Sequence, residues 1–248
     1  MFTQPQLEKL VFFDIETAGQ QASLDDIDDR LQDQWVKRAE FLRNHLGDKY
    51  PDNLEKTDEN LFLAKSALQA EFGRVVCVSF GKMKFNEDGE PIFQLITYKG
   101  SDEEVILQQT FDLMNKLAKS GIKLSGHNIK RFDVPFLCKR GLINGMQLPV
   151  PLQIWDKKPW EIPFVDTSEL WSFGAWQEGF TSLDLLTCVL GVDSPKDDIK
   201  GDQVHEQFWA GNIDRIAEYC QKDVLALAQI ILKLSGQNLI EPHNIIAK

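Results

Sequence analysis

The chain has 248 residues, of which 43% are hydrophobic and 26% are charged, the ordinary composition of a soluble globular protein with a sizeable core. Its four cysteines form no Cys-x-x-Cys pair and no apolar run reaches the roughly 18–20 residues that span a bilayer, so we expect a cytoplasmic protein with reduced thiols and no membrane partner. The net charge of −11 argues against a long basic groove for duplex nucleic acid. Either nucleic acid is not the partner, or it is contacted at a small site where metals and a few lysines supply positive charge.

The first predicted element is a buried strand at residues 10–13, which leads into two acidic residues, Asp14 and Glu16. Side chains alternate between the two faces of a strand, so both carboxylates point the same way, roughly 6–7 Å apart. Two like charges on a core strand repel each other and resist burial. A hard divalent cation with oxygen ligands compensates them best, although an isolated Asp-x-Glu is also typical of a polar strand end that runs into a turn.

About fifty residues separate this strand from the next one, too many for a hairpin connection. Apolar residues at helical spacing predict helices over residues 24–42 and 61–72. The first helix begins with a cluster of four aspartates, which we interpret as a solvated cap at the positive end of the helix dipole rather than a metal site. The members of this cluster are Asp25, Asp26, Asp28 and Asp29. We therefore expect a helical insertion at about residues 19–73.

The rest of the chain alternates between strand and helix patterns. Apolar and β-branched runs predict strands at residues 75–80, 92–98, 123–125 and 164–166. Helical patterns cover residues 101–119, 134–142, 182–190 and 212–234. The expected fold is α/β, with a mixed five-stranded sheet flanked by helices, and residues 1–248 are expected to form one domain.

Two further carboxylates occupy distinctive positions. Asp133 stands at the predicted start of a helix, where an aspartate is also a common N-cap. Tyr219 and Asp223 are four residues apart on the last long helix, so they lie on one face at the edge of its apolar stripe. Each of these residues has an ordinary structural explanation when taken alone. Together with Asp14 and Glu16 they form a set of four carboxylates and a tyrosine.

The order of these motifs is Asp-x-Glu on the first strand, Asn-x-x-x-Phe-Asp in mid-chain and Tyr-x-x-x-Asp on the last helix. It resembles the DEDD superfamily of 3′→5′ exonucleases, which have a ribonuclease-H-like (DnaQ-like) fold. The tyrosine-bearing (DEDDy) subclass is the better match, because Tyr219 precedes Asp223 by four residues, whereas the histidine subclass has its histidine where this chain has Glu218. Within the subclass, residues 71–77, 164–167 and 201–204 are similar to predicted exonucleases related to the proofreading domain of B-family DNA polymerases.

The resemblance implies a set of site residues and a cofactor. The four carboxylates would bind two Mg²⁺ or Mn²⁺ ions, with Asp14 bridging both, and Tyr219 would hydrogen-bond the attacking water. The implied catalytic residues are Asp14, Glu16, Asp133, Tyr219 and Asp223. The backbone around Ile15 and Thr17 and the side chain of Asn128 would contact the terminal nucleotide.

The activity that the resemblance implies is metal-dependent hydrolysis of phosphodiester bonds from the 3′ end of nucleic acid, by a two-metal mechanism that releases 5′-nucleotides. We expect single-stranded DNA as the substrate, because a frayed 3′ end needs one pocket and not a long basic groove. Three alternatives stay open at this point: an RNA-directed exonuclease, a phosphatase or nucleotidase on small substrates, and a non-catalytic module on the same fold that binds nucleic acid or protein. The sequence points to no particular protein partner.

Overall fold

A mixed β-sheet forms the centre of the computed structural model, which describes residues 1–45, 55–175, 181–194 and 199–247. The strand order is β5-β4-β1-β2-β3-β6. The strands are β1 (Leu10–Gly19), β2 (Gly73–Phe85), β3 (Pro91–Lys99), β4 (Lys123–Gly126), β5 (Val165–Asp166) and β6 (Ile245–Ala247). β1, β2 and β3 pair antiparallel, β4 and β5 continue the sheet parallel to β1, and β6 is parallel to β3. Three antiparallel strands followed by two parallel ones beside the first is the ribonuclease-H-like arrangement that the sequence predicts.

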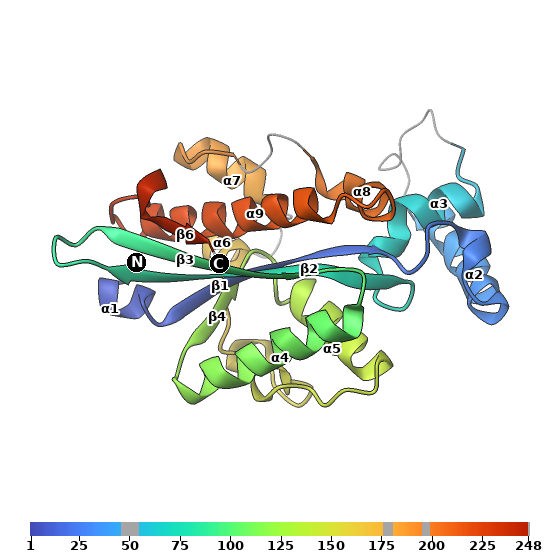
Figure 1. Cartoon of the computed structure of the whole chain (residues 1–248), viewed down its shortest axis with the longest axis horizontal. Coiled ribbons are helices and arrows are strands. Elements are labelled where there is room, and N and C mark those ends of the chain that lie inside the picture. The colour runs from blue at the N-terminus through green and yellow to red at the C-terminus, as the bar shows by residue number, and fades with distance from the viewer. Residues whose placement is uncertain (46–54, 176–180, 195–198, 248) are drawn as a thin grey trace.

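Helices cover both faces of this sheet, with α4 and α5 on one face and α7, α8 and α9 on the other (Figure 1). The helices are α1 (Gln4–Leu7), α2 (Asp29–His45), α3 (Asp58–Lys65), α4 (Glu103–Lys119), α5 (Asp133–Ile143), α6 (Thr167–Ser172), α7 (Leu183–Leu190), α8 (Val204–Trp209) and α9 (Ile213–Leu234). Single 3₁₀ turns lie at Leu24–Asp26, Ser66–Leu68, Val150–Leu152, Pro159–Glu161, Gly201–Gln203 and Pro242–Asn244. The predicted α/β fold is therefore confirmed. None of the helices in the described ranges is long and apolar enough to cross a bilayer.

The alternation of side chains along β1 divides the core into two layers. Phe13 and Ile15 pack with α4 and α5, whereas Phe12 packs with α9. Because side chains at every second position share a face, Asp14 and Glu16 lie on the α9 side of the sheet. The strand thus carries its two acids into the layer between the sheet and the longest helix.

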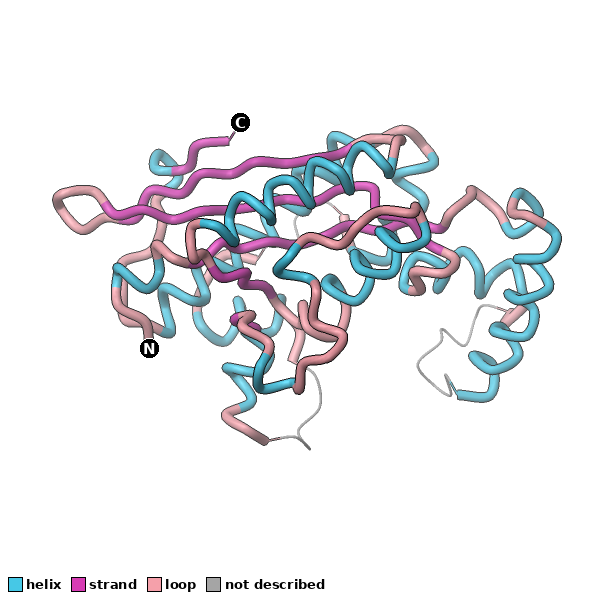
Figure 2. Tube along the Cα trace, turned by 90° about the horizontal axis from the view of Figure 1, so that it is seen from below, coloured by secondary structure: helices cyan, strands magenta, loops and turns pink. Residues whose placement is uncertain are grey.

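The helical insertion lies between β1 and β2, at one end of the sheet, as the view from below also shows (Figure 2). It has a small core of its own, in which Trp35 contacts the ring edges of Phe62 and Phe72 at centroid distances of 5.2 and 4.9 Å. The predicted first helix begins later than expected, at Asp29, because residues 24–26 form a 3₁₀ turn. The predicted second helix is shorter than expected, because α3 passes into a 3₁₀ turn at Ser66 and a strand begins at Gly73.

Over the residues that the structure describes, the sheet has six strands, one more than the sequence predicts. The additional strand, β6, has only three residues and pairs with β3. Its apolar run is too short to show the two-residue alternation by which a strand is predicted. The helix α8 lies between the helices predicted at residues 182–190 and 212–234, where the sequence predicts no helix. It is six residues long, and it is held by long-range contacts, since His205 Nδ1 accepts the N–H of Gly19 at 2.9 Å.

Candidate active site

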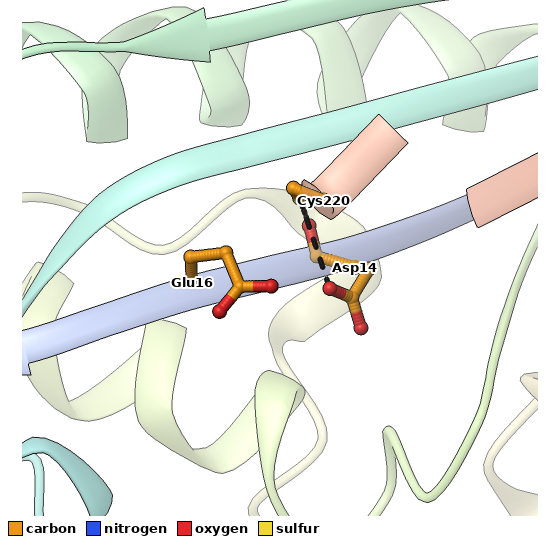
Figure 3. A group of neighbouring side chains, drawn as sticks. All are labelled: Asp14, Glu16 and Cys220. Atoms are coloured by element: carbon orange, nitrogen blue, oxygen red, sulfur yellow. Dashed lines mark hydrogen bonds between the residues drawn. The ribbon is translucent and has the colours of Figure 1, made fainter. Parts of the chain in front are cut away.

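The first two acidic residues lie side by side on β1, facing α9. In Figure 3 the side chains of Asp14 and Glu16 leave the strand in the same direction and their carboxyl groups are turned toward one another. One oxygen of each carboxylate and the sulfur of Cys220 lie within 4.8 Å of one another. This spacing is close to the span that a single oxygen-coordinated divalent cation bridges.

Asp133 joins the pair from the start of α5. β4 pairs with β1 only as far as Phe12, opposite Ser125, so in the described sheet this edge of β1 has no strand partner farther along. The carboxylate of Asp133 occupies that place and accepts a hydrogen bond from the N–H of Ile15 at 3.2 Å. Because Asp133 is only 3% exposed, a buried carboxyl group lies beside Ile15, the residue that separates Asp14 and Glu16.

A tight turn after β4 carries the chain to Asp133. Gly126 leaves no space there for a side chain, because a Cβ would lie 2.0 Å from Cγ2 of Ile129 and 2.9 Å from the carbonyl oxygen of Phe13. The carbonyl of Ile129 in turn accepts the N–H of Val134 in the first turn of α5 at 2.9 Å. The close approach at Gly126 therefore helps to fix where α5 begins.

The buried Asp166, at the end of β5, holds the same turn from the other side. Its carboxylate accepts hydrogen bonds from the N–H groups of Asn128 at 2.8 Å and Lys130 at 3.1 Å. It also caps α6 by accepting the N–H of Ser168 at 3.0 Å. With these contacts Asn128 adopts a φ of 61°, in the left-handed region. The turn that leads to Asp133 is thus anchored by a second buried aspartate.

The helix α9 brings the last two candidate residues to this face of the sheet. Tyr219 and Asp223 are one turn apart, and the hydroxyl of Tyr219 is hydrogen-bonded to the carboxylate of Asp223. Between them, Cys220 donates its S–H to the backbone oxygen of Asp14 at 3.5 Å and to a carboxylate oxygen of the same residue at 3.7 Å (Figure 3). This contact ties α9 to β1 beside the acidic pair.

The electrostatics of the site reflect burial of several like charges. Desolvation raises the pKa of Asp14 well above its usual value, and the charges of Asp133 and Asp223 raise it further. Desolvation likewise raises the pKa of Glu16, with further contributions from Asp14 and Asp223. Burial raises the pKa of Asp133 to about 7, although the hydrogen bond from Ile15 opposes this shift. These mutual effects require the four carboxyl groups to lie near one another.

The donor atoms of the cluster suit a hard divalent cation. Within the described ranges no lysine or arginine pairs with Asp14, Glu16 or Asp133. Burial and the neighbouring Cys77 raise the pKa of Cys220 well above its usual value, so this sulfur stays a protonated donor and not a thiolate ligand. The remaining donors are carboxylate oxygens, which Mg²⁺ and Mn²⁺ prefer, whereas zinc favours thiolate and imidazole.

The three residues expected to contact the terminal nucleotide lie at the same end of the strands. The N–H of Ile15 is taken by Asp133. The hydroxyl of Thr17 donates a hydrogen bond to the carbonyl of Ala67 at 2.7 Å. The backbone N–H of Asn128 is held by Asp166. Ile15 and Thr17 are thus positioned by protein contacts of their own before any nucleotide is present.

Two residues of this region were not singled out by sequence reasoning. Cys220 reads as one more core cysteine on the apolar stripe of α9, and nothing in its spacing indicates contact with Asp14. Asp166 comes with a weak signal, because an aspartate between a short strand and a helix is a common N-cap. That signal predicts the cap but not the hydrogen bonds to the turn before Asp133.

A comparison with known proteins relates this geometry to a family. Residues 65–236 match the profile of the family described as predicted 3′-5′ exonuclease related to the exonuclease domain of PolB. The match includes Asp133, Tyr219 and Asp223, whereas Asp14 and Glu16 precede it in the chain and join them only in the fold. A search of curated proteins gives no match.

Among solved structures, the chain is similar to the family B DNA polymerase from the hyperthermophilic archaeon Pyrobaculum calidifontis, with 17% sequence identity and a TM-score of 0.46. The similarity covers 92% of this chain and 24% of the polymerase chain, so the chain spans about a quarter of the length of that enzyme. Because the family profile matches more than half of the residues, the chain belongs to the predicted 3′-5′ exonucleases related to the exonuclease domain of PolB.

Proposed function

We propose that the chain is an active, metal-dependent 3′→5′ exonuclease that removes 5′-nucleotides from the 3′ end of single-stranded DNA. Residues 1–248 would form a single exonuclease domain with its helical insertion at about residues 19–73. Family membership supports the reaction class. The observation that carries the proposal is the convergence of carboxyl groups from β1, α5 and α9, in which desolvation and neighbouring carboxylates raise the pKa values of Asp14, Glu16 and Asp133.

Such a cluster is unfavourable unless cations bind to it. Each carboxylate loses solvation on burial, and each charge disfavours the ionised form of its neighbours. A fold that needed these residues only for stability would be more stable with apolar side chains in their place. We therefore assign Asp14, Glu16, Asp133 and Asp223 to binding two Mg²⁺ or Mn²⁺ ions.

The bound ions would supply an activated water and stabilise the leaving oxygen, as in other two-metal phosphodiester hydrolases. Tyr219 has a supporting role in this proposal. Burial and the charges of Asp223 and Glu16 raise its pKa, so the phenol stays protonated and holds a water or a phosphate oxygen by hydrogen bonding, not as a base. Asn128 and the backbone at Ile15 and Thr17 would hold the terminal nucleotide against this group.

The charge of the chain supports a strand end as the substrate. With a net charge of −11 the protein repels a long polyanion over most of its surface. A single-stranded 3′ end inserts one terminal nucleotide into a local site and leaves the rest of the polymer outside. RNA offers the same phosphodiester, and the substrate comparison below separates the two.

The test is a degradation ladder. A 5′-labelled oligonucleotide as single-stranded DNA, duplex DNA or RNA is incubated with Mg²⁺, with Mn²⁺ or with EDTA, and a mononucleotide phosphate-release assay runs in parallel. We expect a ladder shortening from the 3′ end, fastest with single-stranded DNA and absent in EDTA. Intact oligonucleotides with both metals would refute the enzyme and favour a binding module. Turnover of the mononucleotide alone would favour a nucleotidase.

A further inference from the structure

A pocket of about 450 Å³ lies between the helical insertion and α5, next to the candidate active site. Arg38 of α2 lines it from the insertion, and Arg131 and Lys139 line it from the turn before α5 and from α5 itself. Phe132, which directly precedes Asp133, and Pro135, two residues after it, form part of the wall. The pocket therefore begins one residue away from the buried carboxylate.

The charge of this pocket is opposite to that of the whole chain. Its lining has three cationic side chains, Arg38, Arg131 and Lys139, and one carboxylate, Glu71. The chain as a whole has a net charge of −11. A local excess of positive charge inside a concave surface attracts an anion more strongly than the same charges on a flat surface would.

The cations of the pocket keep donors available for a ligand. Arg38 donates its Nε–H to the side-chain oxygen of Gln69. The N–H groups of its two terminal nitrogens are then left as donors for a ligand. Lys139 pairs with Glu71 at 2.8 Å, and because both side chains are more than half exposed this pair is weak and exchangeable. Arg131 is exposed, and within the described ranges it makes no ion pair.

The pocket is also connected to the residues that we assign to the terminal nucleotide. Its floor includes Leu68, Gln69 and Ala70, which directly follow Ala67. The carbonyl of Ala67 accepts the hydroxyl of Thr17 at 2.7 Å. Phosphate recognition by arginine uses planar, charge-assisted hydrogen bonds, so the geometry suits a phosphodiester that lies just outside the acidic cluster.

We infer that this pocket binds a backbone phosphate of the substrate strand on the 5′ side of its terminal nucleotide. The helical insertion would then contribute to substrate binding through Arg38, opposite Arg131 and Lys139 of the main fold. This inference rests on the proposed exonuclease function, since it places the strand that leads into the same site.

The first test measures binding of a 5′-fluorescein single-stranded oligothymidylate by anisotropy, in an Asp223→Asn background so that the strand stays intact. Arg131→Gln and Arg38→Gln are each expected to weaken binding roughly 5- to 20-fold and to lower the slope of log Kd against log salt by about 0.7. Glu71→Gln is expected to tighten binding, by about 2- to 5-fold, because it removes the opposing charge and frees Lys139. Lys84→Gln, an exposed lysine of β2 near the hairpin turn at the other end of the strand, is the matched control and should bind like the parent.

A second test locates the phosphate. Single methylphosphonate linkages, which are uncharged, are placed at successive positions from the 3′ end. We expect one position near the 3′ end at which the substitution weakens binding to the parent protein but not to Arg131→Gln. Inorganic phosphate at matched ionic strength serves as the competitor and is expected to displace the oligonucleotide only weakly.

The outcomes of these tests separate the inference from the proposed function. Cleavage by the unmodified chain together with unchanged affinity in Arg131→Gln, Arg38→Gln and Glu71→Gln overturns the pocket while leaving the exonuclease intact. Absence of cleavage overturns the proposed function whatever the pocket does. A pocket that binds inorganic phosphate but shows no linkage position sensitive to Arg131 overturns the inference, because it would be a small-anion site.

Discussion

Two acidic regions of this chain differ in almost every physical respect. The four aspartates at residues 25–29 come from one short stretch that ends at the first residue of α2, and all four are exposed. The carboxylates of the candidate active site come from β1, α5 and α9, and Glu16 and Asp133 are only 7% and 3% exposed. The exposed region has its carboxylates close together in the sequence. In the dispersed region, desolvation raises the pKa values of Asp14, Glu16 and Asp133.

The comparison teaches that desolvation, and not local density of acidic residues, distinguishes the proposed site from an ordinary acidic helix start. The exposed aspartates form local hydrogen bonds. Asp28 accepts the N–H groups of Arg30 and Leu31 at the start of α2, and Asp26 accepts the hydroxyl of Ser23. Solvent screens their mutual repulsion. The carboxylates of the candidate site are less screened by solvent, and their mutual repulsion is relieved by binding protons or metal cations.

The largest expected difference between the regions is in catalysis. Asp14→Asn and Asp223→Asn should each lower the cleavage rate on the order of 10³-fold, about 4 kcal/mol in barrier height. Asp25→Asn and Asp26→Asn should stay within about twofold of the unmodified chain, because their carboxylates are solvated. The ladder assay measures all four under one set of conditions, with melting temperatures to verify folding. Equal rates in Asp14→Asn and Asp25→Asn would remove the distinction between the two regions.

Metal binding should show the same contrast in stability. Mn²⁺ at about 100 times its dissociation constant should stabilise the protein by about 2.7 kcal/mol, since it binds the folded state alone. Glu16→Gln should lose most of that gain, whereas Asp26→Asn should keep it. Thermal unfolding of both variants, each with Mn²⁺ and with EDTA, gives the four melting temperatures that the comparison needs. A similar Mn²⁺ gain in both variants would show that the metal binds elsewhere.

Tyr219→Phe tests the residue that accompanies the buried acids. The substitution removes only the hydroxyl that is bonded to Asp223, so the metal-induced stabilisation should be kept. We expect kcat to fall by about 10- to 100-fold with little change in KM, because the lost hydrogen bond acts on the attacking group. Steady-state kinetics on a short oligonucleotide separates the two constants. A parallel loss of Mn²⁺ stabilisation would indicate a structural role instead.

The pH dependence of stability without metal is a fourth difference. The pKa of Asp133 is about 7 in the folded protein and near 4 when unfolded, so the stability that its proton contributes is lost as pH rises through 7. Relative to the unmodified chain, Asp133→Asn should therefore gain about 1 kcal/mol between pH 6 and pH 8 in EDTA. His127 and His205, whose pKa values are lowered by burial, titrate in both proteins and cancel.

Denaturant unfolding of both proteins at the two pH values measures this gain. Asp25→Asn, treated in the same way, should remain parallel to the unmodified chain. A constant difference between Asp133→Asn and the unmodified chain at both pH values would mean that Asp133 is ionised throughout.

The sequence predicts the framework and the acids of the site because both have periodic or positional signals. The apolar alternation that ends in Asp14 and Glu16 gives their common face, and the four-residue spacing of Tyr219 and Asp223 gives theirs. What brings the two faces together is the packing of α9 on β1, where Cys220 meets Asp14. No single-chain pattern encodes that contact, because it joins residues 206 positions apart.

The parts that sequence reasoning missed depend on such long-range contacts. Asp166 holds the turn before Asp133 through backbone N–H groups 36 and 38 positions away. The pocket beside the site joins Arg38 of the insertion to Lys139 of α5. The strand β6 forms only because the edge of β3 is available to it. In each case the residues concerned look ordinary in their own stretch of sequence.

The smallest expected effect concerns the exposed region alone. Asp28→Ala removes an acceptor from the first turn of α2 and should destabilise the protein by about 1 kcal/mol. Because this cap lies outside the acidic cluster, the loss should be the same with Mn²⁺ and with EDTA, and cleavage should be unchanged. Thermal unfolding under both conditions measures it. If the loss of stability differed between Mn²⁺ and EDTA, the two acidic regions would not be independent. The stability of the insertion would then depend on metal binding at the candidate active site.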